Sequence, residues 1–276
     1  MSSAIDLVAP PGEAPDREID AIVGRDAYRA RGRGPLQWFA RYAAMPLFVG
    51  AAFLALYLYI QGQNLDSLEL RVLNAHAIRR AAAQHLQISL LSTLLVLSLA
   101  IPLGIALTRP WARRITPIAL GIANIGQGVP AIGTFVVVYL VFFRDGRLAS
   151  IVGMTIYCFL PVLRGAMVGL EQVDRDLIKA ARGMGMSKGR ILRRIELPMS
   201  VPILLTGVRT ALVLNVSTAV LAGFIAGGGF GAILIQGFGL RRQSAILVGS
   251  VLAGGFALLA DWVGRIAEDV LRPRGL

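Results

Sequence analysis

The sequence predicts an all-α protein, a polytopic membrane helical bundle with six transmembrane helices. Of its 276 residues, 55% are hydrophobic and 16% are charged, and the mean hydropathy is +0.66. This composition is typical of proteins that cross a membrane several times. Six segments have the roughly 20 mostly apolar residues that a helix needs to span a bilayer. A strongly basic segment separates the fourth of them from the fifth.

The predicted spans organise the chain. Residues 1–41 are rich in Pro, Gly and mixed charges, and we expect a disordered cytoplasmic tail there. Residues 42–84 are expected to form the first span and an outer loop that carries a short helix. Residues 85–266 form the main transmembrane domain, and residues 267–276 a cytoplasmic end. The six spans are predicted at residues 42–60, 85–107, 115–142, 148–170, 199–226 and 244–266.

The third predicted span contains a break. Residues 126–130, GQGVP, place two glycines and a proline in its middle. Irregular backbone at membrane depth is tolerated only where protein or a water-filled cavity covers it. We therefore expect the third span to lie inside the bundle, with Gln127 and Pro130 as candidates for the lining of a translocation pathway. A simple packing kink is the alternative.

The positions of the basic residues predict the orientation. If the N-terminus is inside, 19 of the 28 Lys and Arg residues fall in cytoplasmic segments and 7 in outer loops. Cytoplasmic loops of membrane proteins accumulate such residues. We therefore expect a multi-pass protein of the inner (plasma) membrane with both termini in the cytoplasm. The net charge of +12 is explained in the same way, without a nucleic-acid partner.

The basic segment between the fourth and fifth spans predicts a helix–turn–helix elbow in the cytoplasm. Asp174 is a suitable N-cap for the first helix, and Gly183 and Gly185 are expected to end it. Ser187 can cap the second helix, which we expect to end at Pro198. Small and apolar side chains recur at helical spacing along one face of the first helix; they are Leu177, Ala180, Ala181 and Met184.

Residues 179–198, KAARGMGMSKGRILRRIELP, resemble the EAA loop of permease subunits of binding-protein-dependent ABC importers. The family pattern is Glu-Ala-Ala, three residues, Gly, nine residues, Ile, one residue, Leu-Pro. Further stretches are similar to the osmoprotectant branch for glycine betaine, choline and proline, namely NIGQGVPAIG, IYCFLPVLRGAMVGL, LPMSVPILLTGVRTA and GFIAGGGFG. The positions that carry the loop pattern are Lys179, Ala180, Ala181, Gly185, Ile195, Leu197 and Pro198.

The resemblance implies a transport subunit with several partners. The elbow would be a coupling helix that docks on a separate ATPase subunit, and a solute-binding protein would deliver substrate at the outer face. A second permease copy or a paralogue would complete a dimer in the lipid membrane. The chain has no GxxxxGK[ST] phosphate loop. Mg-ATP is therefore expected on the partner ATPase, with no cofactor and no enzymatic activity in this chain.

Lys179 departs from the family pattern, because the family has an acidic residue at this position. Two interpretations are open. The partner ATPase carries a matching change, or Lys179 is a solvated helix residue and the nearby Glu171, Asp174 and Asp176 supply the negative charge.

Several polar residues fall within the predicted spans. Arg209 either lines the pathway or bonds backbone carbonyls at a helix break, and Arg164 is expected to reach the cytoplasmic interface. Asn215 and Thr218 either contact substrate or bond neighbouring helices. Two glycine clusters, residues 227–231 and 237–239, are expected to form tight outer turns.

Other classes of function have less support in the sequence. We find no nucleophile–base pair or paired carboxylates for an intramembrane enzyme, and expect no catalytic residues. The single cysteine, Cys158, and the two histidines, His76 and His85, lack the spacing of a metal site. A permease for another small amine or amino acid remains an alternative, as does a secondary transporter, which would need no elbow shaped for a partner.

Overall fold

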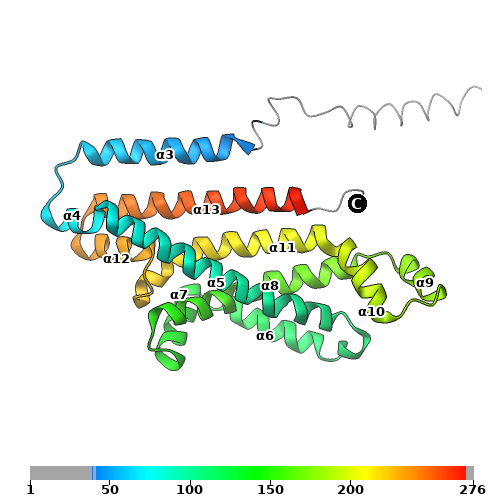
Figure 1. Cartoon of the computed structure of the whole chain (residues 1–276). Coiled ribbons are helices and arrows are strands. Elements are labelled where there is room, and N and C mark those ends of the chain that lie inside the picture. Colours follow the sequence, from blue (N-terminus) through cyan, green and yellow to red (C-terminus); the bar gives the residue numbers. More distant parts are fainter. Residues whose placement is uncertain (1–38, 40–41, 272–276) are drawn as a thin grey trace, which may run out of the picture. The chain divides into compact units, whose positions relative to one another are not determined.

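A computed structural model describes residue 39 and residues 42–271, and Figure 1 shows that these residues are almost entirely helical. The described residues contain no strand, so the predicted all-α fold is confirmed. The expected disorder of the tail and the end of the C-terminal segment lie outside the described residues. The helices before the elbow are α3 (Ala44–Gln61), α4 (Ser67–Leu73), α5 (Ala75–Leu107), η1 (Pro110–Ala112), α6 (Thr116–Gly128), α7 (Ala131–Val137), η2 (Val138–Phe142) and α8 (Gly146–Glu171). Those from the elbow onward are α9 (Arg175–Gly183), α10 (Lys188–Ile191), η3 (Leu192–Glu196), α11 (Leu197–Thr218), η4 (Ala219–Ile225), α12 (Phe230–Leu240) and α13 (Gln243–Leu271).

Every predicted span coincides with long apolar helix. Within the described residues, five helical stretches are long and apolar enough to cross a bilayer, and α6 with α7–η2 forms a sixth that is bent by 97°. The second span begins at Ala75, earlier than expected, because the polar side chain of Asn74 caps it by accepting a hydrogen bond from the backbone N–H of Ala77 at 2.8 Å. The outer loop is correspondingly shorter, and the short helix expected in it is α4.

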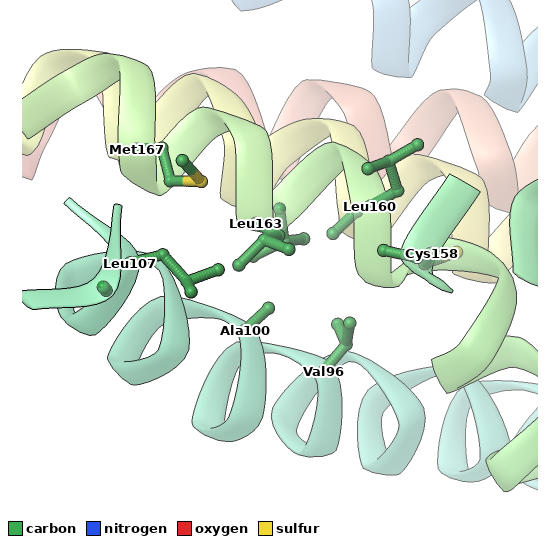
Figure 2. Packing of buried hydrophobic residues seen from close by; sticks show 11 residues of the cluster. Val96, Ala100, Leu107, Cys158, Leu160, Leu163 and Met167 are labelled. Atoms are coloured by element: carbon green, nitrogen blue, oxygen red, sulfur yellow. The ribbon is translucent and has the colours of Figure 1, made fainter. Parts of the chain in front are cut away.

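The centre of the bundle is the contact between α5 and α8 (Figure 2). Val96 and Leu163 are fully buried there, and Met167 packs beside them. Gly104 brings the two helices close together, since a Cβ atom added to it would lie only 2.7 Å from the Cβ of Ala166. Lipid tails are as apolar as the side chains, so the hydrophobic effect does not drive helices together within a membrane. Small residues such as glycine promote association there because they let two helix backbones pack closely.

The third span is broken where the sequence predicts it. The chain leaves α6 with Val129 in an extended conformation, and Pro130 precedes α7. The expectation that this span lies inside the bundle holds for its second half, where Phe135 and Val138 are buried, and is wrong for its first half. Only Ala123 of α6 is buried, whereas Ile118, Ile122 and Ile125 are each more than 60% exposed. Helix α6 packs on α8 with one side alone and leaves an apolar row uncovered.

Pro198 does not end the second helix of the elbow, contrary to prediction. Helical structure continues from Lys188 to Ile225. A π turn over Leu192–Glu196 directly precedes the proline, and the N–H of Leu197 bonds the carbonyl of Leu192, five residues back. The regular pattern of hydrogen bonds to the carbonyl four residues back is therefore already interrupted before Pro198. Because Pro198 lies in the first turn of α11, the N–H group that it lacks costs little stability.

The segment 227–243, predicted to be an outer loop, is mostly helix. Gly228 and Gly229 have positive φ angles, 88° and 72°, and form the expected turn before α12. Gly237 and Gly239 lie inside α12, so the second predicted glycine turn is wrong. Gly237 instead allows α12 to approach Ala245 and Ile246 of α13.

Candidate functional site

The elbow predicted from the sequence is present as α9 and α10. The side chain of Asp174 caps α9 by accepting a hydrogen bond from the N–H of Asp176 at 2.7 Å. Helix α9 ends at Gly183, and Gly185 makes the turn with a φ of 80°. Ser187 caps α10, its hydroxyl accepting from the N–H of Arg190 at 3.4 Å. Each of these local predictions is confirmed.

One face of α9 is apolar and open to solvent. Leu177 and Met184 are 40% and 76% exposed, and Ala180 between them is also exposed. Ala181 differs from the expectation of a four-residue outer face, because it is 1% exposed and packs within the chain. The rim is basic; exposed cations on the elbow are Arg175, Lys179, Arg182, Lys188, Arg190, Arg193 and Arg194.

An ion pair ties the elbow to the membrane bundle. Glu196 lies in the π turn at the base of the elbow, and its carboxylate is 2.6 Å from Nη2 of Arg109. Arg109 follows α5 and also donates from Nε to the carbonyl of Ile105 at 3.2 Å. Ile191 is buried next to this point, and Ile195 is half-buried. The elbow is therefore attached to the C-terminal end of α5 as well as to α11.

Sequence reasoning missed both members of this pair. A weak signal was available, because Glu196 is the one acidic residue in the basic stretch 188–198. Its partner lies 87 residues away, and only the fold shows that they meet.

Lys179 forms an ion pair within the elbow. Its Nζ is 2.8 Å from the carboxylate of Asp176, one turn earlier, and both side chains are more than 70% exposed. Exposed pairs of this kind contribute little to stability, typically below about 1 kcal/mol. Lys179 therefore stands on the solvent side of α9, close to one of the acids that the sequence analysis singled out.

The five residues predicted to line a pathway do not form one site. Asn215 is fully buried between helices: its Oδ1 accepts from Ser92 at 3.1 Å and its Nδ2 donates to Thr93 at 3.0 Å, both on α5. The Thr218 hydroxyl donates to the carbonyl of Leu214 in its own helix at 2.7 Å. Gln127 and Pro130 flank the break between α6 and α7.

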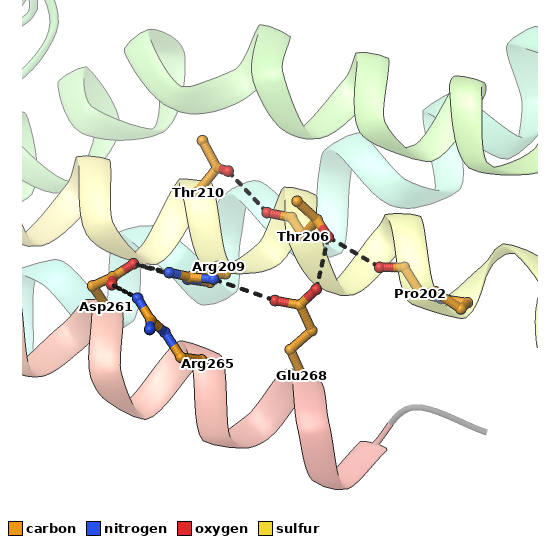
Figure 3. Close-up of polar contacts among 7 residues, drawn as sticks. All are labelled: Pro202, Thr206, Arg209, Thr210, Asp261, Arg265 and Glu268. Carbon is orange, nitrogen blue, oxygen red and sulfur yellow. Dashed lines mark hydrogen bonds and ion pairs between the residues drawn. The ribbon is translucent and has the colours of Figure 1, made fainter. Parts of the chain in front are cut away.

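Arg209 pairs with carboxylates instead of backbone carbonyls (Figure 3). Its Nε donates to Asp261 at 2.8 Å, and its Nη1 lies 3.5 Å from Glu268. Arg265 adds a second cation at 3.3 Å from Asp261. Two positive and two negative charges thus join α11 to α13, and their formal sum is zero.

A polar face on α6, α8 and α11 is a further feature that the sequence analysis did not identify. Arg164 of α8 donates to the side-chain oxygen of Asn124 on α6 at 3.1 Å, and both side chains are exposed. Beside Arg164 a pocket of about 370 Å³ opens between α8 and α11, and Thr206 and Thr210 contribute to its lining. Polar groups at membrane depth face protein or water rather than lipid.

No group of three or more potential ligands for a metal ion lies together in residue 39 and residues 42–271. The features of the site are therefore an exposed elbow, an ion pair at its base and a polar face higher in the bundle.

Comparison with known proteins places the chain among transport proteins. The family described as binding-protein-dependent transport system inner membrane component matches residues 100–274. A glycine betaine/carnitine/choline transport system permease protein of Bacillus subtilis, OpuCB, is 32% identical over 193 residues, 70% of this chain and 88% of that protein. The osmoprotectant import permease protein OsmY of Salmonella typhimurium is 32% identical over 222 residues, which cover 79% and 92% of the two chains.

Solved structures share the fold. A chain of the methionine ABC transporter MetNI in an inward-facing conformation aligns with a TM-score of 0.63 at 21% identity, over 71% of this chain and 96% of that one. A chain of a bacterial alginate ABC transporter aligns with a TM-score of 0.59 at 15% identity, over 95% and 98%. At these identities the likeness concerns the architecture alone.

Proposed function

The chain belongs to the family of binding-protein-dependent transport system inner membrane components, and from this membership we propose that it carries osmoprotectants such as glycine betaine, carnitine or choline into the cell. Members of the family are permease subunits of ABC transporters and not enzymes, and the ATPase is a separate subunit. The substrate class rests on the relatives, whose names include glycine betaine, carnitine, choline and osmoprotectants.

The exposed elbow is the observation that carries the coupling role. A basic helix pair with an uncovered apolar face, formed by Leu177, Ala180 and Met184, suits a groove on a partner protein. We assign that partner as the ATPase subunit. When it moves the elbow, the pair of Arg109 and Glu196 passes the displacement to α5, and the continuous helix passes it to α11.

The remaining partners follow from the uncovered surfaces. A second permease copy or a paralogue packs against the exposed isoleucines of α6, so that the polar face beside them borders protein or water and not lipid. A solute-binding protein delivers substrate at the face opposite the elbow. The assembly sits in the inner membrane with the elbow and both termini in the cytoplasm, as the distribution of basic residues predicts.

Transport by the reconstituted importer tests this function. The chain is placed in proteoliposomes with its ATPase and binding protein, and ATP-dependent uptake of labelled glycine betaine, choline and proline is measured. Gly185→Trp is expected to abolish uptake and leave membrane insertion intact, because any side chain at a φ of 80° strains the turn that aligns the elbow.

Gly50→Trp on α3 is the matched control. An added Cβ there meets nothing within 4 Å, so uptake is expected to persist. Normal uptake by the Gly185 variant would contradict the coupling role, and a wild-type importer that moves none of these compounds would contradict the substrate class.

A further inference from the structure

Arg209 of α11 and Arg164 of α8 both lie within membrane-spanning helices, Arg164 seven residues before the end of its helix, and their surroundings differ. Arg209 on α11 is neutralised by Asp261 and Glu268 of α13 (Figure 3). A neutralised arginine of this kind joins helices and has no charge left to attract a ligand.

Arg164 on α8 is not neutralised by a carboxylate of the described residues. Its one polar partner within the described part of the chain is the neutral side chain of Asn124, and no carboxylate there lies within 4.0 Å of it. A cation within a span is costly unless it meets water, an anion or a partner. Its side chain is exposed, on the same side of α8 as a pocket.

The pocket has the size of a small-solute site. Its volume of about 370 Å³ is at the lower end of the roughly 300–1,000 Å³ typical of ligand pockets. Gly165 and Gly207 supply the room, because the helices meet there with little side-chain bulk: a Cβ added to Gly165 would lie 3.4 Å from the Cα of Gly207.

Arg164 is the donor left available in this pocket. The Thr210 hydroxyl donates to the carbonyl of Thr206 at 2.8 Å, and the Thr206 hydroxyl donates to Glu268 at 3.0 Å. A guanidinium has five N–H groups, and the bond to Asn124 uses one of them. That bond also holds the planar group in place.

We propose that Arg164, held by Asn124, forms a subsite in the pocket between α8 and α11 that binds the carboxylate of zwitterionic substrates and discriminates against choline. This inference rests on the proposed function. Glycine betaine and carnitine carry a carboxylate, which a guanidinium binds through two parallel hydrogen bonds. Choline has a positive charge and no carboxylate, so the same cation repels it.

The lining of the pocket supports recognition of this end of the molecule. Quaternary ammonium groups are bound by aromatic faces, and the described residues that line the pocket include no aromatic ring. This lining therefore offers no aromatic surface for the quaternary ammonium end, and Arg164 is the group in it that can bind the anionic end.

Ligand binding to the complex of permease and ATPase, without the binding protein, tests the subsite. The complex is embedded in lipid nanodiscs and its unfolding temperature is measured with millimolar glycine betaine, carnitine or choline. Ligands that bind the native state raise this temperature. Glycine betaine and carnitine are expected to raise it and choline is not. Arg164→Gln is expected to weaken glycine betaine binding at least tenfold, the effect of losing a charged hydrogen bond.

Two further variants separate charge from structure. Arg164→Lys keeps the cation and is expected to retain part of the binding. Arg147→Gln removes an exposed arginine at the other end of the same helix, and is expected to bind like the wild type.

The subsite is overturned if choline stabilises the complex as much as glycine betaine, if Arg164→Gln binds glycine betaine like the wild type, or if none of the ligands binds. These outcomes are distinct from failure of the proposed function, which would be seen as a complete wild-type importer that takes up none of the compounds.

Discussion

Arg209 shows how a charged residue is accommodated at membrane depth. Its side chain is 26% exposed, and those of Asp261 and Glu268 are 24% and 27% exposed. The pairs are therefore partly shielded from solvent, and removal of one partner leaves the others incompletely compensated. The cost of such a removal falls between the values for exposed and for buried ion pairs.

Arg209→Gln is predicted to lower the free energy of unfolding by about 2 kcal/mol. Asp261→Asn alone is predicted to have a similar effect, because it leaves Arg209 and Arg265 with less negative charge beside them. The double variant should lose less than the sum of the two, since both changes remove the same interaction. Denaturation in detergent gives the free energies of unfolding of the wild type, the two single variants and the double variant. Strictly additive losses would contradict an interaction between Arg209 and Asp261.

At this scale the sequence identifies the residues that need an explanation but not their partners. Arg209 and Asn215 stand out in an apolar span because polar groups there are rare. Asp261 lies 52 residues from Arg209, and Ser92 lies 123 residues from Asn215. Only the packing of α11 against α13 and α5 brings these pairs together, so the sequence left the role of each residue open.

Among the helical elements, the contact between α5 and α8 depends on Gly104. The Cβ of Ala166 and the carbonyl oxygen of Leu163, at 3.2 Å, occupy the space that a side chain on Gly104 would need. These are atoms of a helix, not the end of a flexible side chain. An added methyl group therefore has to push the helices apart.

Gly104→Ala is predicted to destabilise the protein by about 1–3 kcal/mol, the usual cost of overpacking a core. The same change at Gly50 on α3, where nothing lies within 4 Å of an added Cβ, should be neutral or stabilising, because alanine favours a helix over glycine. Thermal unfolding of the two variants compares them directly. Equal stability of the two variants would contradict this prediction, because it would show that α5 and α8 can move apart without loss of stability.

The elements themselves follow from local sequence to a large extent. Caps such as Asp174 and Ser187 and the turn at Gly185 act through neighbouring residues, and these predictions hold. The predicted helix end at Pro198 and the predicted turn at residues 237–239 are wrong. A π turn directly before Pro198 lets the helix continue through the proline, and Gly237 is needed for close packing of α12 on α13. Proline and glycine have structural and packing uses that a single segment does not distinguish.

For the whole molecule, the orientation in the membrane decides whether the elbow can reach an ATPase. Met184 is 76% exposed at the tip of α9, and the only cysteine, Cys158, is fully buried. The native cysteine is therefore expected to stay unreactive, and a new cysteine will report its own surroundings.

Met184→Cys is predicted to react with a membrane-impermeant maleimide in inverted vesicles and not in intact cells. Asn64→Cys, in the short segment between α3 and α4, is predicted to show the opposite pattern. Labelling of position 184 from outside intact cells would place the elbow on the wrong side of the membrane for coupling.

The assembly is the level at which the sequence of one chain is least informative. The interruption at residues 126–130 predicts a buried span, and α7 is buried in part whereas α6 leaves its isoleucines uncovered. Irregular backbone within a membrane must be shielded from lipid, but this requirement does not specify which molecule shields it. A second subunit satisfies it as well as the chain's own helices do.

Asn215 fixes α11 to α5 at one level, and this has a consequence for how far each end of the helix can travel. Glu196 lies 19 residues before Asn215 and Ile225 ten residues after it, the last seven of them in the 3-10 helix η4. At about 1.5 Å per residue in the α-helix and about 2.0 Å in the 3-10 helix, the two arms measure about 28 and 18 Å. A helix that swings about this fulcrum acts as an unequal lever. Each ångström of sideways motion at the Glu196 end would produce about two-thirds of an ångström, in the opposite direction, at the Ile225 end.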